Sequence, residues 1–182
     1  MIRPCGGRLR IRDLALVAAL LAPVAAAAAD VSLRFHGNGA AAPDLDRVKI
    51  RIDAPARPAD VKGDFTLEFW MRALAGENTA ATCAAGPDNW ITGSILFDRD
   101  VFGAGDYGDW GVSLFADGLA FGVARGNAGA GICSSQNLSS EPVDLADDRW
   151  HHVAVTRRKS DGRLQIFVDG RLEATGGGPI GN

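Results

Sequence analysis

Two adjacent histidines are the residues of this sequence best suited to proton transfer near neutral pH. They stand in the stretch "WHHVAVTRRKSDGRLQIFVDG", residues 150–170. The residues that follow them alternate between apolar and polar types with a period of two, which predicts a β-strand. Adjacent side chains of a strand point to opposite faces, so His151 and His152 are not expected to act together on one substrate. We expect hydrogen-bonded or surface imidazoles, with Trp150 packed at the entrance of the strand.

Carboxylates are the next candidates for chemistry. Residues 30–182 contain 17 aspartates and four glutamates, and no two of these glutamates lie within four positions of each other. Retaining glycoside hydrolysis needs two carboxyl groups about 5 Å apart on one face. Asp98 and Asp100, on one face of a predicted strand end, are the remaining candidate pair, with a surface or cation-binding role as the alternative. Because no G-x-S-x-G, H-E-x-x-H or phosphate-binding loop occurs either, we expect a protein that is not an enzyme.

The segment "FDRDVFGAGDYGDWG", residues 97–111, is the best candidate for binding a cation or another ligand. It places four aspartates among glycines and aromatic residues: Asp98, Asp100, Asp106 and Asp109. Short carboxylates are good ligands for hard cations, although they also favour turns.

Aromatic residues supply a second kind of contact, because sugar rings stack on aromatic faces. Trp90, Tyr107 and Trp110 lie in or beside predicted loops and are predicted to bind ligand. For Trp90 and Trp110, packing in the interior remains an equal alternative. Trp70 and Trp150 belong to strongly patterned strands, so we expect them to be packed.

The elements that position these residues are short strands joined by turns rich in glycine and aspartate. In residues 65–72 the alternation places Phe65, Leu67, Phe69 and Met71 on one face and Thr66, Glu68, Trp70 and Arg72 on the other. Further strands are predicted over 31–35, 47–52 and 94–98, and in hairpins over 110–124 and 151–174. The expected turns are Asp117-Gly118, Ser160-Asp161-Gly162 and Asp169-Gly170.

This pattern predicts an all-β fold, a two-sheet antiparallel β-sandwich or jelly roll, in which each sheet buries one face and leaves the other in water. Residues 75–92 and 125–142 show no period and are predicted as loops.

Residues 1–29 are predicted to be a secretion signal peptide, with a basic start, an apolar stretch over 14–25 and small residues up to Ala29. The mature chain would be secreted or periplasmic, without a membrane span, and would form one domain over residues 30–182. Removing residues 1–29 leaves 15 basic and 21 acidic residues, which speaks against nucleic acid as a partner. In an exported chain the remaining cysteines, Cys83 and Cys133, are expected to form a disulfide rather than two free thiols.

Several stretches together resemble the laminin-G-like, concanavalin A-like jelly-roll domains. They are "DDRWHHVAVTRRKSDGRLQIFVDG", "FTLEFWMRA" and "DWGVSLFADGLAFGV". The resemblance runs from about Val31 to the C-terminus. The resemblance implies a two-sheet sandwich that is not catalytic and binds a glycan or a cell-surface glycoprotein, often with calcium. It also implies further strands after the last hairpin, so the domain is predicted to lack its last strands.

The resemblance implies a calcium site at Asp109, with a backbone carbonyl near Gly126 as the next ligand. We therefore expect an exported recognition module that binds through loops at the edge of the sandwich. Two alternatives stay open: a carbohydrate-active enzyme with an unrecognised carboxylate pair, and an adhesion element that binds only protein.

Overall fold

The computed structural model describes residues 31–35, 48, 61–76, 82–100, 108–125, 128–136 and 143–181. The chain divides into two units, residues 1–49 and 50–182. In the first unit, residues 31–35 are exposed and lie outside any strand, so the strand predicted there is wrong. Alternation is compatible with any extended segment, whereas a strand also needs a hydrogen-bonded neighbour. The predicted signal peptide lies outside the described residues, as does the strand predicted over 47–52 apart from Val48.

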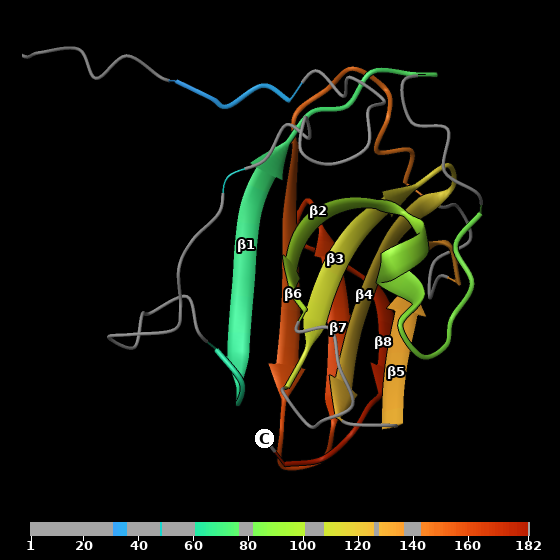
Figure 1. The fold of residues 1–182 in the computed structure, drawn as a ribbon. Helices are drawn as coiled ribbons and strands as arrows, with labels where there is room; N and C mark the ends of the chain where they lie inside the picture. The colour runs from blue at the N-terminus through green and yellow to red at the C-terminus, as the bar shows by residue number, and fades with distance from the viewer. Residues whose placement is uncertain are drawn as a thin grey trace, which may run out of the picture. The chain divides into compact units, whose positions relative to one another are not determined.

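The second unit contains two four-stranded antiparallel sheets that lie face to face (Figure 1). Sheet A has the strand order β1-β6-β7-β8, and sheet B has the order β2-β3-β4-β5. The strands are β1 (Phe65–Met71), β2 (Ser94–Arg99), β3 (Trp110–Phe115), β4 (Gly118–Arg125), β5 (Ala128–Cys133), β6 (His151–Arg158), β7 (Arg163–Val168) and β8 (Arg171–Gly177). Among the described residues, two short 3-10 helices are also present, η2 (Asn89–Thr92) and η3 (Ser134–Gln136). The predicted all-β, two-sheet antiparallel sandwich is confirmed.

The main hydrophobic core lies between the two sheets. The alternation of β1 is confirmed, because Phe65, Leu67, Phe69 and Met71 are buried or half-buried while the residues between them are exposed. Sheet A contributes further apolar side chains from β6 and β7, and sheet B contributes those of β3 and β4. The fully buried members of this core are Val112, Leu119, Phe121, Val153, Val155, Leu164, Ile166 and Val168. Burying an aliphatic or aromatic side chain of this size contributes about 1.5–3 kcal/mol, so this face fixes the strand register.

The turns of the two predicted hairpins differ in how well they follow the sequence pattern. Asp169 and Gly170 connect β7 and β8 with φ values of 49° and 77°, as the Asp-Gly signal predicts. Between β3 and β4, however, Phe115 pairs with Gly118, so the turn is Ala116-Asp117 and not Asp117-Gly118. The carboxylate of Asp117 accepts a hydrogen bond of 2.7 Å from the backbone N–H of Cys83, which ties this turn to a distant segment.

Sheet B departs from the predicted pattern, because β3 is buried along its whole length and β4 along most of it. The segment 82–93 covers the outer face of this sheet and forms a second core with it, made of Cys83, Trp90, Phe115, Ala120 and Cys133. Strand β5, which lies within a predicted loop, closes the sheet by pairing with β4. Its sequence of small residues carries no alternation, so pairing alone identifies it as a strand.

In the part of the chain that the structure describes, no helix has the length and apolar character needed to cross a membrane.

Candidate functional site

His151 lies at the start of β6 between two carboxylates. Its Nδ1 is 2.8 Å from Oδ2 of Asp169, and its Nε2 is 3.0 Å from Oδ1 of Asp147. The side chain is buried, whereas that of His152 on the opposite face is partly exposed. The prediction that the two imidazoles face apart and are either hydrogen-bonded or at the surface is therefore confirmed: His151 is hydrogen-bonded and His152 is partly exposed. We call His151, Asp147 and Asp169 the His151 clamp.

The His151 clamp favours the protonated imidazole. Burial lowers the pKa of His151, but the hydrogen bonds and charges of Asp169 and Asp147 outweigh burial and raise the pKa above its ordinary value. The hydrogen bond from His151 lowers the pKa of Asp147. Partial burial raises the pKa of Asp169. The hydrogen bonds from His151 and from the backbone of His152 lower it by more, so the pKa of Asp169 is also below its ordinary value. With both ring nitrogens protonated, the imidazolium donates to both carboxylates and holds the segment before β6 to the β7–β8 turn.

Trp70 projects from the outer face of sheet A and is 64% exposed. Its ring centroid lies 5.2 Å from that of His152, with an angle of 52° between the planes. The carboxylate of Glu68, whose side chain is 70% exposed, lies 3.6 Å from Nε2 of His152. We call these three residues the Trp70 surface. An exposed indole beside a carboxylate and an imidazole offers both a stacking face and hydrogen-bonding groups.

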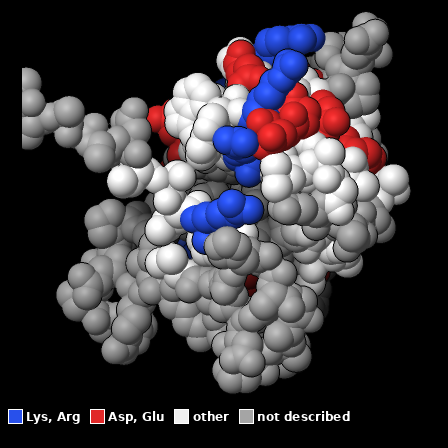
Figure 2. Space-filling model, turned by 90° about the horizontal axis from the view of Figure 1, so that it is seen from above, with Lys and Arg blue, Asp and Glu red and all other residues white. Residues whose placement is uncertain are grey.

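Trp150, just before β6, is 49% exposed. The expectation that Trp70 and Trp150 are packed is therefore wrong. Ion pairs occupy the same end of the domain, where β1 ends and β6 begins: Arg72 with Asp148 at 2.7 Å and Arg149 with Asp147 at 3.6 Å. Figure 2 looks onto this end and shows acidic and basic side chains side by side.

The predicted ligand-binding residues Trp90 and Trp110 are buried, with 1% and 7% of their surface exposed. Trp110 faces the main core, and its Nε1 donates a hydrogen bond of 3.1 Å to the carbonyl of Val61. Trp90 lies on the outer face of sheet B against Gly111 and Gly122, where a Cβ atom at either position would collide with its ring. The prediction that these two indoles stack on a ligand is wrong, because neither ring face is accessible. Tyr107 lies outside the described residues.

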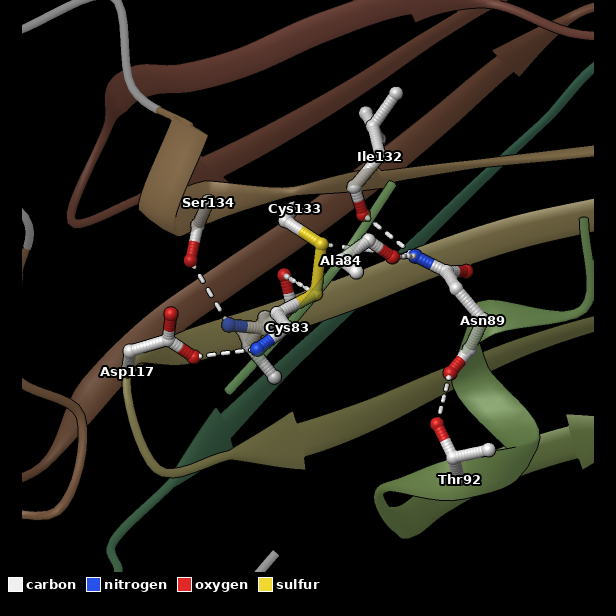
Figure 3. The surroundings of a disulfide bond; sticks show 9 residues. Cys83, Ala84, Asn89, Thr92, Asp117, Ile132, Cys133 and Ser134 are labelled. Carbon is white, nitrogen blue, oxygen red and sulfur yellow. Dashed lines mark hydrogen bonds between the residues drawn. A yellow bond between two sulfur atoms is a disulfide. The ribbon is translucent and has the colours of Figure 1, made fainter. Parts of the chain in front are cut away.

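The segment that carries Trp90 is held down by the predicted disulfide between Cys83 and Cys133, which is confirmed (Figure 3). Nδ2 of Asn89 donates to the carbonyls of Ala84 and Ile132 at 3.3 and 3.5 Å. The backbone N–H of Leu119 donates a hydrogen bond of 2.8 Å to Oγ of Ser134, the residue after Cys133. These contacts make residues 82–93 part of the folded structure rather than a loop free to receive a ligand.

Acidic side chains gather where β2 ends and β3 begins. Burial, followed by the charges of Asp109, Asp98 and Asp88, raises the pKa of Asp100. The carboxylate of Asp109 lies 3.8 Å from Nη1 of Arg99, and its side chain is 16% exposed. Gly126, the other predicted calcium ligand, lies outside the described residues. Among the residues that are described, no group of three or more histidine, cysteine, aspartate or glutamate side chains is arranged to hold a metal ion.

Comparison with known families agrees with this architecture. Residues 47–181 match the laminin G model described as the concanavalin A-like lectin/glucanases superfamily. The chain belongs to this superfamily. A search of curated proteins found no match. A concanavalin A-like domain of this kind is consistent with a module that binds carbohydrate or protein.

Within this concanavalin A-like domain, the Trp70 surface is the feature that sequence reasoning missed. The alternation of β1 already placed Trp70 beside Thr66, Glu68 and Arg72 on the polar face. A large aromatic residue on the polar face of a strand indicates an exposed contact residue. Trp70 was instead expected to pack in the interior because it lies within a strongly patterned strand.

Proposed function

We propose that the domain is an exported, non-catalytic recognition module that binds a glycan through the Trp70 surface. The observation that supports this proposal is the 64% exposure of Trp70 on the outer side of β1, where the other outward residues, Thr66 and Glu68, are polar. Leaving an indole in water forgoes the free energy of burying it, so an exposed tryptophan beside polar groups is typical of a contact for a partner. The C–H face of a pyranose ring stacks on the indole, while Glu68 and His152 can exchange hydrogen bonds with its hydroxyl groups.

A glycan array tests this proposal, with the folded domain applied once in calcium and once in EDTA. We expect binding in both buffers, and we expect Trp70→Ala to weaken it more than about tenfold, as for an aromatic hot spot. Ile91→Ala is the matched control, because Ile91 is 49% exposed on η2, which covers the other sheet. Absence of binding in either buffer would reject a sugar ligand and direct the search to protein partners.

Export is the second part of the proposal. It rests on the basic start, apolar stretch and small-residue segment of residues 1–29 and on the disulfide between Cys83 and Cys133, which suits an oxidising compartment. Expression of the full chain in a bacterial host, followed by N-terminal sequencing of the protein recovered outside the cytoplasm, should give a start at Asp30. An uncleaved chain confined to the cytoplasm would reject this part.

Calcium binding at Asp109 is a separate proposal that the residues fit only in part. The mutual repulsion of the carboxylates around Asp100 would be relieved by a divalent cation. Arg99, however, already lies 3.8 Å from Asp109, and the described donors do not form a complete calcium site. Calorimetric titration with calcium alone should give binding that Asp109→Asn abolishes. No heat of binding with the unaltered domain would reject the cation.

Glycoside hydrolysis is the second candidate function, and one observation favours it. The raised pKa of Asp100 beside Asp98 is the electrostatic condition for a general acid. Activity on a panel of β-glucans that Asp100→Asn and Asp98→Asn each abolish would establish this candidate over the non-catalytic module.

A further inference from the structure

The outward side chains of sheet A form rows that run across its strands. In one row the strand register pairs four hydroxyl and amide side chains directly: Thr66, Thr156, Gln165 and Thr175. Thr66 and Thr175 are exposed, and the other two are half-buried. This row, which we call the threonine row, therefore places uncharged hydrogen-bonding groups on all four strands, and the Thr175 hydroxyl already donates to the carbonyl of Leu164 at 3.3 Å.

The neighbouring row is more apolar. It consists of Glu68, Ala154, Phe167 and Leu172, which are also paired in register. A register shift after Ile166 pairs Phe167 with Leu172 and Ala174 with Ile166, so Leu172 joins the outer face while Ala174 stays buried. Phe167 and Leu172 are half-buried, so part of each side chain faces water.

Trp70, Ala154 and Phe167 lie on a line that crosses three strands of sheet A. Trp70 on β1 pairs with His152, and Ala154 follows two residues later on the same face of β6. Phe167 lies beside Ala154 on β7. Trp70 and Phe167 thus stand two strand spacings and one row apart, about 12 Å, with His152 and Ala154 between them. Thr156 and Gln165 lie alongside this line in the next row.

On the described part of this face, charged side chains lie on the edge strand β1 and at the ends of the strands, where exposed Arg163 is paired in register with Arg158. Glu68, the one acidic side chain of the two rows, lies beside His152. Arg72 pairs with Asp148 at one end of the strands, and Arg158 pairs with Asp161 at the other. The central surface therefore presents aromatic rings, a small apolar side chain and neutral hydroxyl and amide groups, which complements an uncharged ligand.

We propose that this face binds a linear, uncharged polysaccharide that lies across the strands, and this inference rests on the proposed function. Two non-adjacent sugar rings of one chain stack on Trp70 and Phe167, and the hydroxyl groups of the chain exchange hydrogen bonds with Thr156 and Gln165. The domain binds an internal stretch of the polymer rather than a chain end, since the line of contacts crosses three strands of the sheet.

Affinity electrophoresis tests the ligand class, with neutral β-glucan, xylan and mannan as probes and pectate and heparin as charged comparisons. We expect a neutral polymer to retard the domain and the charged polymers not to. Oligosaccharides of the retarding polymer, from two to six units, should bind more tightly as length increases. Equal affinity for the shortest and longest oligosaccharides, or retardation only by a charged polymer, would overturn the inference.

Variants of the threonine row separate this inference from the proposed function. Thr156→Val and Gln165→Met keep the size of the side chains and should each weaken binding about three- to tenfold, the value of one hydrogen bond, whereas Thr156→Ser should retain it. Urea unfolding of each variant verifies that the fold is kept. If Trp70→Ala abolishes binding while the row variants leave it unchanged, the proposed function stands and this inference fails. If no polysaccharide or array glycan binds, both fail.

Discussion

The indole ring of Trp90 lies directly on Gly122, leaving no room for a Cβ atom at that position. Gly122 pairs with Gly111 on β3 and with Gly131 on β5, so three glycines stand side by side across sheet B. Trp90 covers Gly111 and Gly122, and Asn89 covers Gly131. The bare backbone of three adjacent strands thus receives a segment that is distant in the sequence.

Gly122→Ala should lower the free energy of unfolding by about 1–3 kcal/mol, the usual result of overpacking a core. The added methyl group would push Trp90 off the sheet. Urea unfolding followed by tryptophan fluorescence measures the change. Gly177→Ala is the matched control in β8, because a Cβ atom there meets nothing within 4 Å. Equal stability of the two variants would contradict the placement of Trp90.

Removing the disulfide by the paired changes Cys83→Ser and Cys133→Ser should lower the free energy of unfolding by about 2–5 kcal/mol. The bond joins cysteines 50 positions apart and fixes the segment 82–93 on sheet B. Hydrogen exchange should therefore lose protection in this segment before the main core does. Uniform loss of protection over both sheets would show instead that the second core does not open separately.

The His151 clamp makes stability depend on pH in a defined direction. Because the pKa of His151 is raised, the clamp contributes stability that is complete below the ordinary value of 6.5 and is lost as pH rises through the raised value. At acid pH, the pKa values of Asp147 and Asp169 are lowered from the ordinary aspartate value of 3.8. The stability that these two carboxylates contribute is therefore present above pH 3.8 and is lost as pH falls through their lowered pKa values.

Urea unfolding between pH 5 and pH 9, in roughly unit steps, measures the alkaline part of this dependence. The slope above neutral pH should disappear in His151→Gln. His152→Gln, which changes the neighbouring imidazole outside the clamp, should keep it. A slope that survives in His151→Gln would assign the pH dependence to another group.

Arg157 should be far less tolerant of substitution than its neighbour Arg158. Its guanidinium is buried and donates to four backbone carbonyls, those of Lys62, Gly63, Pro179 and Gly181, at 2.6–3.2 Å. The ammonium group of lysine cannot reach both segments, so Arg157→Lys should lower the free energy of unfolding by about 3 kcal/mol. Arg158→Lys, in an exposed position, should change it by less than about 0.5 kcal/mol. Faster proteolysis near residues 178–181 in Arg157→Lys alone would locate the effect.

Local sequence determined the frame of this protein. The alternation of β1 and β6 decided which side chains enter the core, because the period of two is a property of the strand itself. The Asp169-Gly170 turn followed from the positive φ angles that this pair tolerates. The order of these signals along the chain sufficed for the two-sheet sandwich and for the facing of His151 and His152.

The tertiary structure alone decided which aromatic residues are accessible. Trp90 follows an irregular segment, and its burial depends on Gly111 and Gly122 of two strands that meet only when sheet B forms. Strand β5 is likewise defined by its pairing with β4, since its small residues carry no period. Trp70 stays exposed because in the described structure no segment covers sheet A as residues 82–93 cover sheet B. Such coverage depends on contacts between residues far apart in the chain, and no local pattern encodes it.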